Sequence, residues 1–203
     1  MLGRSKVAQG ANPHVVVFAG PNGAGKSTHA EPLLKVLKIQ TFVNADFIAR
    51  GLAGLNTETV NFEAGRIMLN RIHQLAADKK DFAFETTLSS RSFAPFLRQL
   101  KKNGYQITLF YFSLSSASLA YRRVRHRVKM GGHNIPQKTI TRRYYRSLKN
   151  LFDLYMNIAD NWLVFDNSGS KSAEFVANCS NQEVHIFRSK TWQKIKLLAQ
   201  HNR

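Results

Sequence analysis

A glycine-rich stretch near the start of the chain has the residue types and spacing of a phosphate-binding loop. It fits the pattern G-x-x-x-x-G-K-[ST], in which backbone N–H groups and a lysine hold phosphate. With the residue that follows it, the stretch consists of Gly20, Pro21, Asn22, Gly23, Ala24, Gly25, Lys26, Ser27 and Thr28. The glycines allow a sharp turn, and the helix expected from about Lys26 adds the positive end of its dipole. We expect the stretch to bind a nucleoside triphosphate, with Lys26 at the β- and γ-phosphates and Ser27 on Mg²⁺.

Two other interpretations of the stretch fit less well. A dinucleotide-binding fingerprint requires a third glycine, and Thr28 stands in its place. An ordinary glycine-rich turn with a chance lysine explains neither the full eight-residue match nor the apolar run 15–19 directly before it. A buried strand on one side and a helix on the other are what the phosphate-binding mechanism requires.

A carboxylate about twenty residues beyond this loop is a candidate general base. Thr41–Asn44 has the character of a short second strand, and it is followed by Ala45 and Asp46. Ligands of open α/β sheets bind at the carboxyl ends of the strands, so Asp46 is placed to accept the proton of an incoming hydroxyl group. A second interpretation is that Asp46 caps the helical turn 47–52, because aspartate favours that position. The sequence leaves both open.

A second acidic residue ends the third predicted strand. Residues 81–87 form a short apolar run that closes on Glu85, Thr86 and Thr87. Glu85 is expected to act on Mg²⁺ through water or to hold substrate hydroxyls, and Thr87 to add a hydroxyl contact. The alternative is a polar residue at a strand end that faces solvent.

Basic residues dominate the middle third of the chain and suggest a lid over the site. No acidic residue lies between Glu85 and Asp153, whereas fourteen lysines and arginines do. The paired glycines at 131 and 132 mark a hinge, and arginines from a mobile segment can stabilise a transferring phosphoryl group. We expect a lid at about 122–146 in which three arginines lead, namely Arg127, Arg142 and Arg143. Arg122, Arg123, Arg125, His126 and His133 have a more ambiguous role.

The charge balance favours polyanionic partners. The formal net charge is +18 at pH 7, and such a field attracts a nucleotide pair in a cleft, a nucleic acid or an acidic protein that covers the site. A solvated basic surface is an equally good explanation for outer members of the set such as Lys101 and Lys102.

Length and composition predict one soluble domain. The chain has 203 residues, 43% of them hydrophobic, enough for one sizeable core over 1–203. The single cysteine, Cys179, has no partner for an internal disulfide, and a reducing compartment is compatible with it. The start of the chain lacks an apolar signal segment, and no stretch has the length needed to cross a membrane. We expect a cytoplasmic protein.

Strand and helix patterns alternate along the chain and predict a three-layer α/β fold. Further strands are expected at 107–114, 162–166 and 184–187, and helices at 27–37, 57–80, 93–102, 116–130, 136–158 and 191–200. The helix at 57–80 should bury Phe62, Ile67, Met68, Ile72 and Leu75. The helix at 136–158 should bury Ile140, Tyr144, Leu148, Leu151 and Tyr155. Such alternation gives a mostly parallel sheet of five or more strands.

Taken together, these motifs resemble the zeta-toxin family of P-loop kinases, in particular its short bacterial branch. The resemblance rests on the phosphate loop, Val43–Asp46, Phe84–Leu88, and the segment from Arg127 to Tyr144 with its two arginines at 142 and 143. It extends from residue 16 to about 150, and Asn167–Gly169 continues it on the adenine side. The order and spacing of these motifs are more specific than any one of them.

The resemblance implies an ATP- and Mg²⁺-dependent kinase that phosphorylates a sugar hydroxyl of a nucleotide-sugar such as UDP-N-acetylglucosamine. It also implies a toxin whose antitoxin blocks the ATP site. By position, Lys26, Ser27 and Asn167 match nucleotide-binding residues, Asp46 the base, and Glu85 and Thr87 the substrate side. Arg127 with Arg142 or Arg143 matches the lid pair. One departure concerns the acceptor: Ser89 stands where the family has an arginine, and the nearest arginine is Arg91.

Two other functions suit the same residues. A nucleic-acid-end (polynucleotide) kinase would use the basic third of the chain, although no recognisable nucleic-acid-binding motif is present. A non-catalytic ATP-binding regulator would keep the phosphate loop, with Asp46 and Glu85 as structural caps.

Overall fold

A twisted seven-stranded sheet with helices on both faces organises the computed structural model, which describes residues 12–52, 57–131, 134–169 and 172–200. The strands are β1 (His14–Ala19), β2 (Phe42–Val43), β3 (Phe82–Thr86), β4 (Gln106–Ser113), β5 (Asn161–Asp166), β6 (Glu174–Ser180) and β7 (Glu183–Ile186). Their order across the sheet is β2-β3-β1-β4-β5-β6-β7. The five strands from β2 to β5 run parallel, and β6 and β7 continue the sheet antiparallel. The predicted mostly parallel sheet is confirmed.

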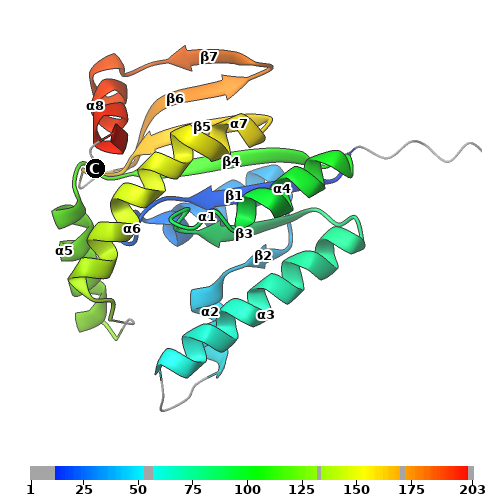
Figure 1. Cartoon of the computed structure of the whole chain (residues 1–203), viewed down its shortest axis with the longest axis horizontal. Coiled ribbons are helices and arrows are strands. Elements are labelled where there is room, and N and C mark those ends of the chain that lie inside the picture. Colours follow the sequence, from blue (N-terminus) through cyan, green and yellow to red (C-terminus); the bar gives the residue numbers. More distant parts are fainter. Residues whose placement is uncertain (1–11, 53–56, 132–133, 170–171, 201–203) are drawn as a thin grey trace, which may run out of the picture.

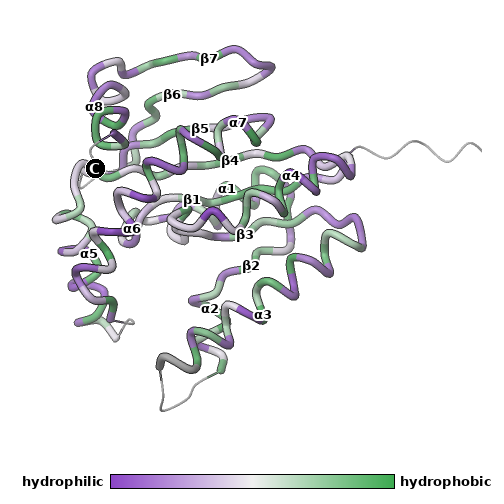
Figure 2. Tube along the Cα trace, viewed as in Figure 1, coloured by the Kyte–Doolittle hydropathy of each residue, from purple (hydrophilic) through white to green (hydrophobic). Residues whose placement is uncertain are grey.

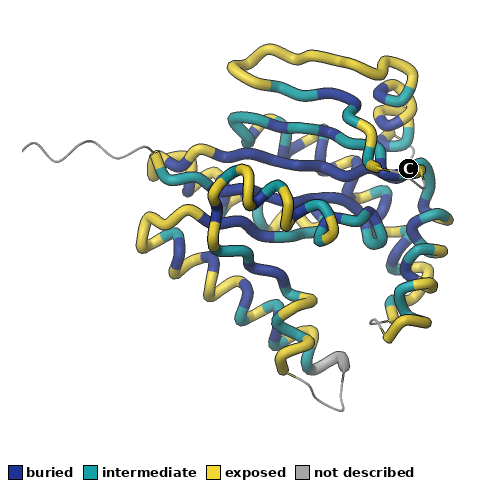
Figure 3. Tube along the Cα trace, turned by 180° about the vertical axis from the view of Figure 1, so that it is seen from behind, coloured by how far each residue is buried: buried dark blue, intermediate teal, exposed yellow. Residues whose placement is uncertain are grey.

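Helices link the strands and cover the sheet. They are α1 (Lys26–Leu37), α2 (Ala45–Leu52), α3 (Thr57–Ala77), α4 (Phe93–Lys102), α5 (Ala117–Lys129), α6 (Gln137–Asn150), the π-helical turn η1 (Leu151–Tyr155), α7 (Met156–Ile158) and α8 (Ser189–Gln200). In Figure 1, α3, α4 and α6 lie on the near face of the sheet and α1 on the far face. Figure 3 shows α1 in front when the molecule is turned around. The sheet is therefore the middle of three layers.

The core follows the central strands. Val15–Ala19 of β1 are buried, and β4 is buried from Ile107 to Ser113, without the alternation of a half-exposed strand. Figure 2 shows both strands in the colours of apolar residues. Strands buried on both faces are expected where helices cover each side of a parallel sheet. The burial of these strands fixes the carboxyl edge of the sheet. The polar residues of the candidate site follow the strands at this edge.

Two expectations about long helices need correction. Phe62 is 79% exposed, because the buried stripe of α3 runs through Ala64, Met68, Ile72 and Leu75 and Phe62 lies outside that face. The helix predicted at 136–158 buries the expected side chains from Ile140 to Tyr155, but it changes to π-helical geometry at Leu151–Tyr155.

The carboxyl-terminal part contains a strand that the sequence patterns did not indicate. β6 pairs antiparallel with β5, with a register shift between Val164 and Phe165, and β7 forms the exposed edge. Cys179 lies on β6 as a partly buried free thiol. Within the described residues, no helix has both the length and the hydropathy to cross a membrane.

Candidate functional site

The phosphate loop lies between β1 and α1, as the sequence predicts. All three glycines have positive φ angles, +140° at Gly20, +77° at Gly23 and +80° at Gly25, the residue before α1. A Cβ atom on Gly20 would lie 2.3 Å from the carbonyl oxygen of Phe112 in β4. The loop therefore packs directly on the neighbouring strand, and only glycine fits there.

Asn167, at the end of β5, holds the loop from the other side. Its buried Nδ2 donates to the carbonyl oxygen of Ala24 at 2.9 Å, and its backbone N–H donates to Ser113 at 3.0 Å. Arg123 of α5 closes the same corner, because its Nη2 donates to the carbonyl oxygen of Gly169 at 2.9 Å. Asn167 thus positions the phosphate loop, and a contact with adenine remains a prediction.

Lys26 and Ser27 meet Glu85 at the carboxyl edge of the sheet. The Ser27 hydroxyl donates to Glu85 Oε2 at 2.6 Å, and Lys26 Nζ lies 3.5 Å from Glu85 Oε1. Asn44 Nδ2 donates to the same Oε2 at 2.8 Å. The Glu85 side chain is 13% exposed, so the solvent-facing alternative is wrong.

Asn44 tests the cap interpretation of Asp46. Its Oδ1 accepts hydrogen bonds from the backbone N–H groups of Asp46, at 2.8 Å, and of Phe47, at 3.3 Å. Asn44 is therefore the cap of α2, and the cap interpretation of Asp46 is wrong. The Asp46 side chain is free to face Arg127 of α5, whose Nη1 lies 3.3 Å from Asp46 Oδ2. An asparagine directly before a helix is itself a sequence signal for a cap, but the prediction placed the cap two residues later, at Asp46.

The arginines of the predicted lid divide into two groups. Arg127 and Arg143 are partly buried and line the same cavity, whereas Arg142 is exposed and does not. Burial and the neighbouring Arg142 guanidinium lower the pKa of Arg143, against the opposing effect of the Asp46 carboxylate. Arg91 and His126 are also exposed. The hinge residue Gly132 and its neighbour His133 lie outside the described residues.

These groups surround a cavity of about 480 Å³. The phosphate loop contributes Asn22, Gly23 and Lys26 to its lining, and the carboxylates Asp46 and Glu85 also line it. The end of β3, the loop after it, the start of α4 and the start of α6 also contribute to the wall, with Thr86, Thr87, Ser89, Ser90, Phe93 and Thr139. Of these, only Thr87 was predicted to contact the substrate, and its hydroxyl lies 2.9 Å from that of Ser89.

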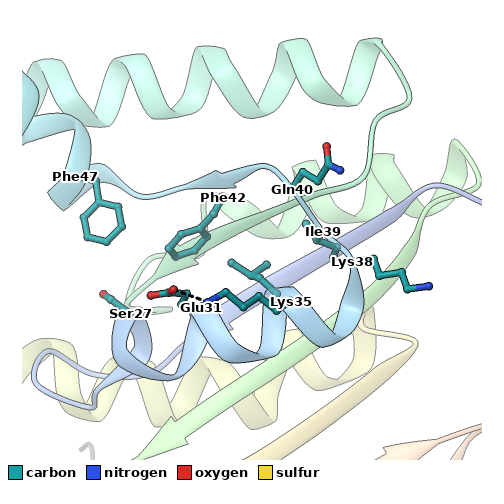
Figure 4. A pocket seen from close by; sticks show the side chains of 9 residues that line it. Ser27, Glu31, Lys35, Lys38, Ile39, Gln40, Phe42 and Phe47 are labelled. Carbon is teal, nitrogen blue, oxygen red and sulfur yellow. Dashed lines mark hydrogen bonds and ion pairs between the residues drawn. The ribbon is translucent and has the colours of Figure 1, made fainter.

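A second cavity, of about 690 Å³, lies beside α1 and holds none of these carboxylates (Figure 4). Apolar side chains from α1, β2 and α2 line it, with Glu31, Lys35 and Lys38 among its polar members. Of the residues described above, Ser27 and Phe47 line it. The chemistry-bearing residues therefore gather at the first cavity.

The oxygen atoms around Ser27 fit a bound Mg²⁺. The Ser27 hydroxyl and the Glu85 carboxylate lie within one hydrogen bond of each other, and Mg²⁺ takes oxygen ligands from few protein groups, with phosphates and water completing its shell. No cluster of three or more histidine, cysteine or acidic residues occurs among the described residues. A site that needs substrate phosphates as ligands is consistent with this.

Comparison with known proteins gives one family match and several similar folds. The family model of the AAA domain matches residues 15–149. An uncharacterised protein of Haemophilus influenzae is 29% identical over 129 residues, which are 64% of this chain and 91% of that protein.

Solved structures share the fold at low identity. A chain in the complex of AvrRxo1-ORF1 and -ORF2 with ATP has a TM-score of 0.76 at 16% identity, over 93% of this chain and 65% of that chain. This chain thus spans slightly less than two thirds of that protein. The PezAT toxin–antitoxin system of Streptococcus pneumoniae gives a TM-score of 0.63 at 15% identity, over 98% and 83%. The Pnkp1/Rnl/Hen1 RNA repair complex gives 0.59 at 18%, over 75% and 49%. The predicted three-layer P-loop kinase fold is confirmed.

Proposed function

From the premise that this chain belongs to the AAA domain family, we propose that it is an ATP-dependent kinase with a hydroxyl acceptor. The observation that carries the proposal is a single cavity lined by both the phosphate-loop lysine, Lys26, and the Asp46 carboxylate, which forms an ion pair with Arg127. A donor phosphate on the loop and an acceptor hydroxyl at Asp46 would meet in that cavity. Positioning and charge stabilisation are the main requirements of phosphoryl transfer.

The residues have distinct parts in the reaction. The loop N–H groups and Lys26 hold the β- and γ-phosphates of ATP. The acceptor oxygen bonds to the γ-phosphorus as the bond to the β,γ-bridging oxygen breaks, ADP leaves, and Asp46 takes the hydroxyl proton. Arg127 and Arg143 balance the charge on the transferred group. Ser27 directly and Glu85 through water would hold Mg²⁺, which would neutralise negative charge of the ATP phosphates when bound.

The acceptor we propose is a sugar hydroxyl of a nucleotide-sugar, in the manner of zeta toxins. The order of the motifs around Asp46, Glu85 and Thr87 supports it, as does the shared fold with the PezAT toxin–antitoxin system. The same resemblance suggests an acidic antitoxin as partner. The basic helices α5 and α6, which contain no acidic residue, would attract such a protein to the side of the cavity.

A transfer screen tests the proposal. Purified protein is incubated with ATP and Mg²⁺ and with UDP-sugars, free sugars, nucleotides and oligonucleotides, and the products are identified by mass. Gain of one phosphate by a small acceptor, with release of ADP, is the expected result. Transfer to oligonucleotide ends alone would overturn it.

One observation favours a polynucleotide end as the second candidate acceptor. Exposed cations recur at helical spacing on α5, at Arg122, Arg125 and Lys129, and on α6, at Lys138, Arg142 and Arg146. Binding of a polynucleotide to this face would weaken steeply with rising salt, whereas binding of a small acceptor would not. The third function, a regulator without catalysis, predicts ATP binding but no phosphorylated product from any acceptor.

A further inference from the structure

The helix α6 directs three consecutive side chains to three different surroundings. Arg142 is exposed, Arg143 is partly buried and lines the first cavity, and Tyr144 has no exposed surface. Each residue turns an α-helix by about 100°, so one step along the chain leads from solvent to the cavity and the next leads to the core. The position of the Arg143 guanidinium therefore depends on how α6 is attached to the sheet.

The Tyr144 hydroxyl attaches α6 to the carboxyl end of β4. It donates to the carbonyl oxygen of Leu114, the residue directly after the strand, at 2.6 Å. Both residues are buried, and burial raises the pKa of the Tyr144 hydroxyl, so the hydroxyl keeps its proton and remains a donor. A buried carbonyl oxygen that loses its only donor is costly. The bond is therefore a fixed connection between the helix and the edge of the sheet.

A second buried hydroxyl joins the same helix to the same strand. The Ser147 hydroxyl lies 3.0 Å from the hydroxyl of Tyr111 in β4, and neither residue has any exposed surface. Residues three apart lie on one face of an α-helix, so Tyr144 and Ser147 both point from α6 toward the sheet. Two hydrogen bonds, one turn apart, thus hold this face of the helix on β4.

The helical segment that continues from α6 is attached to the neighbouring strand. Asn150 Nδ2 donates to the carbonyl oxygen of Leu88 at 2.9 Å, and the Tyr155 hydroxyl donates to that of Ser90 at 2.7 Å. Both acceptors lie in the loop after β3. Four hydrogen bonds from α6 and η1 therefore join the carboxyl ends of β3 and β4, and movement of α6 away from the sheet as a lid would break them.

The helix α5 is attached differently. A Cβ atom on Gly23 of the phosphate loop would lie 3.1 Å from the Cβ atom of Arg123, so the middle of α5 packs closely on the loop. Beyond Val124, none of the α5 side chains that the structure describes is buried. Arg127 lies in this loosely packed end, and its position depends on the ion pair with Asp46.

Arg143 has no carboxylate that could fix it in the same way. Within the ranges that the structure describes, no ion pair includes Arg143. Burial and the neighbouring Arg142 lower its pKa, and the Asp46 carboxylate opposes them, but a guanidinium stays protonated. A partly buried cation without a bonded anion lies there at a cost. Its helix must therefore hold it at the cavity.

From these observations we infer that Tyr144 and Ser147 are positioning residues, which hold Arg143 at the cavity before ATP or the acceptor binds. A charge that is already in place stabilises a transition state without reorganisation at the moment of reaction. Arg127, in contrast, becomes available to the transferred group when an acceptor takes its place at Asp46. This role rests on the proposed kinase function and divides the predicted lid, 122–146, into a fixed helix, α6, and a preceding segment that carries Arg127.

A double-mutant cycle on Tyr144 and Arg143 tests this role. The kcat of phosphate transfer is measured at saturating ATP and Mg²⁺ with the acceptor that the transfer screen identifies. Tyr144→Phe should lower kcat roughly 2- to 10-fold and leave KM for ATP unchanged. Arg143→Ala should lower kcat about 10²- to 10³-fold. In a protein that already carries Arg143→Ala, Tyr144→Phe should lower kcat by less than about twofold, because the two changes remove the same contribution.

Tyr105→Phe is the matched control. Tyr105 is also buried, and its hydroxyl donates to the carbonyl oxygen of Lys80 at 3.0 Å, directly before β4 begins and thus at the other end of that strand. Its loss should lower the urea midpoint of unfolding as much as Tyr144→Phe does, with kcat unchanged. Ser147→Ala removes the second bond to β4 and should lower kcat with the same dependence on Arg143.

The outcomes separate the positioning role from the kinase function. Equal loss of kcat from Tyr144→Phe with and without Arg143 would overturn the positioning role and leave the kinase function intact. An unchanged kcat in both Tyr144→Phe and Ser147→Ala would do the same, as would an equal loss in Tyr105→Phe. Absence of transfer by the wild-type protein to every acceptor would overturn both.

Discussion

Replacement of Asp46 by asparagine should separate catalysis from stability. The change is isosteric and removes only the proton-accepting charge and the ion pair with Arg127. That pair joins side chains that are 56% and 37% exposed, with 3.3 Å between Oδ2 and Nη1. Exposed pairs of this kind contribute about 0–1 kcal/mol to the free energy of unfolding. Loss of a general base lowers the rate about 10²- to 10⁴-fold, which is roughly 3–5 kcal/mol of transition-state stabilisation.

The assay measures the initial rate of ADP release at saturating ATP with the best acceptor, and urea denaturation gives the free energy of unfolding. Asp153→Asn is the matched control, because Asp153 is 53% exposed and pairs with Lys149 at 2.8 Å on α6 and η1. We expect Asp46→Asn to lose activity and Asp153→Asn to keep it, with similar small effects on unfolding. Transfer by Asp46→Asn at the wild-type rate would refute the assignment of the base. A loss of stability as large as the loss of transition-state stabilisation would show that Asp46 is structural.

Three further predictions follow from the loop, from Glu85 and from His14. Gly20→Ala should lower the free energy of unfolding by at least about 1–3 kcal/mol, because the new Cβ atom would lie 2.3 Å from the carbonyl oxygen of Phe112. Gly65→Ala, on α3, should instead raise the free energy of unfolding by about 0.5–1 kcal/mol, because its Cβ atom would enter open space. Urea denaturation measures both changes. Glu85→Gln should raise the Mg²⁺ concentration needed for half-maximal transfer about 10- to 100-fold at unchanged KM for the acceptor, and an unchanged Mg²⁺ titration would contradict its metal role. Burial lowers the pKa of His14 below its usual 6.5, against the opposing effects of Asp81 and Asp160. The unfolded chain then takes up the proton first, so the free energy of unfolding should fall as the pH is lowered through 6.5 and level off below the folded-state pKa. His14→Gln should flatten this dependence in denaturation curves between pH 7 and 5.

The parts of the fold that were predictable have local causes. The unbroken apolar runs of β1 and β4, and the glycines of the phosphate loop, carry their structure in consecutive residues, and both are confirmed. Phe62 was assigned to the wrong face, because the helical spacing of apolar residues in α3 permits more than one stripe and only the packed structure selects one. β6 mixes polar and apolar residues and becomes a strand by pairing with β5.

The site shows the same division between local and long-range causes. The rule that parallel strands deliver polar residues to one edge was enough to bring Lys26, Asp46 and Glu85 together. The contacts that hold these residues in place were beyond the sequence, because they join distant positions. Asn167 contacts Ala24 across 143 residues, and Asn150 contacts Leu88 across 62. No local pattern distinguishes an asparagine with such a partner from one on the surface.

Asn44 explains how an exposed carboxylate on a helix without buried residues can serve as a base. None of the α2 side chains is fully buried, although Ala45 and Ile48 pack against the core. The buried amide of Asn44 adds hydrogen bonds that fix the backbone at Asp46, since its Oδ1 accepts from the N–H of Asp46 while its Nδ2 donates to Glu85. One planar group thereby joins the start of α2 to the end of β3. The distance between the proposed base and the proposed metal-side carboxylate is therefore set by hydrogen bonds, and the Asp46 side chain keeps the freedom to exchange Arg127 for a substrate hydroxyl.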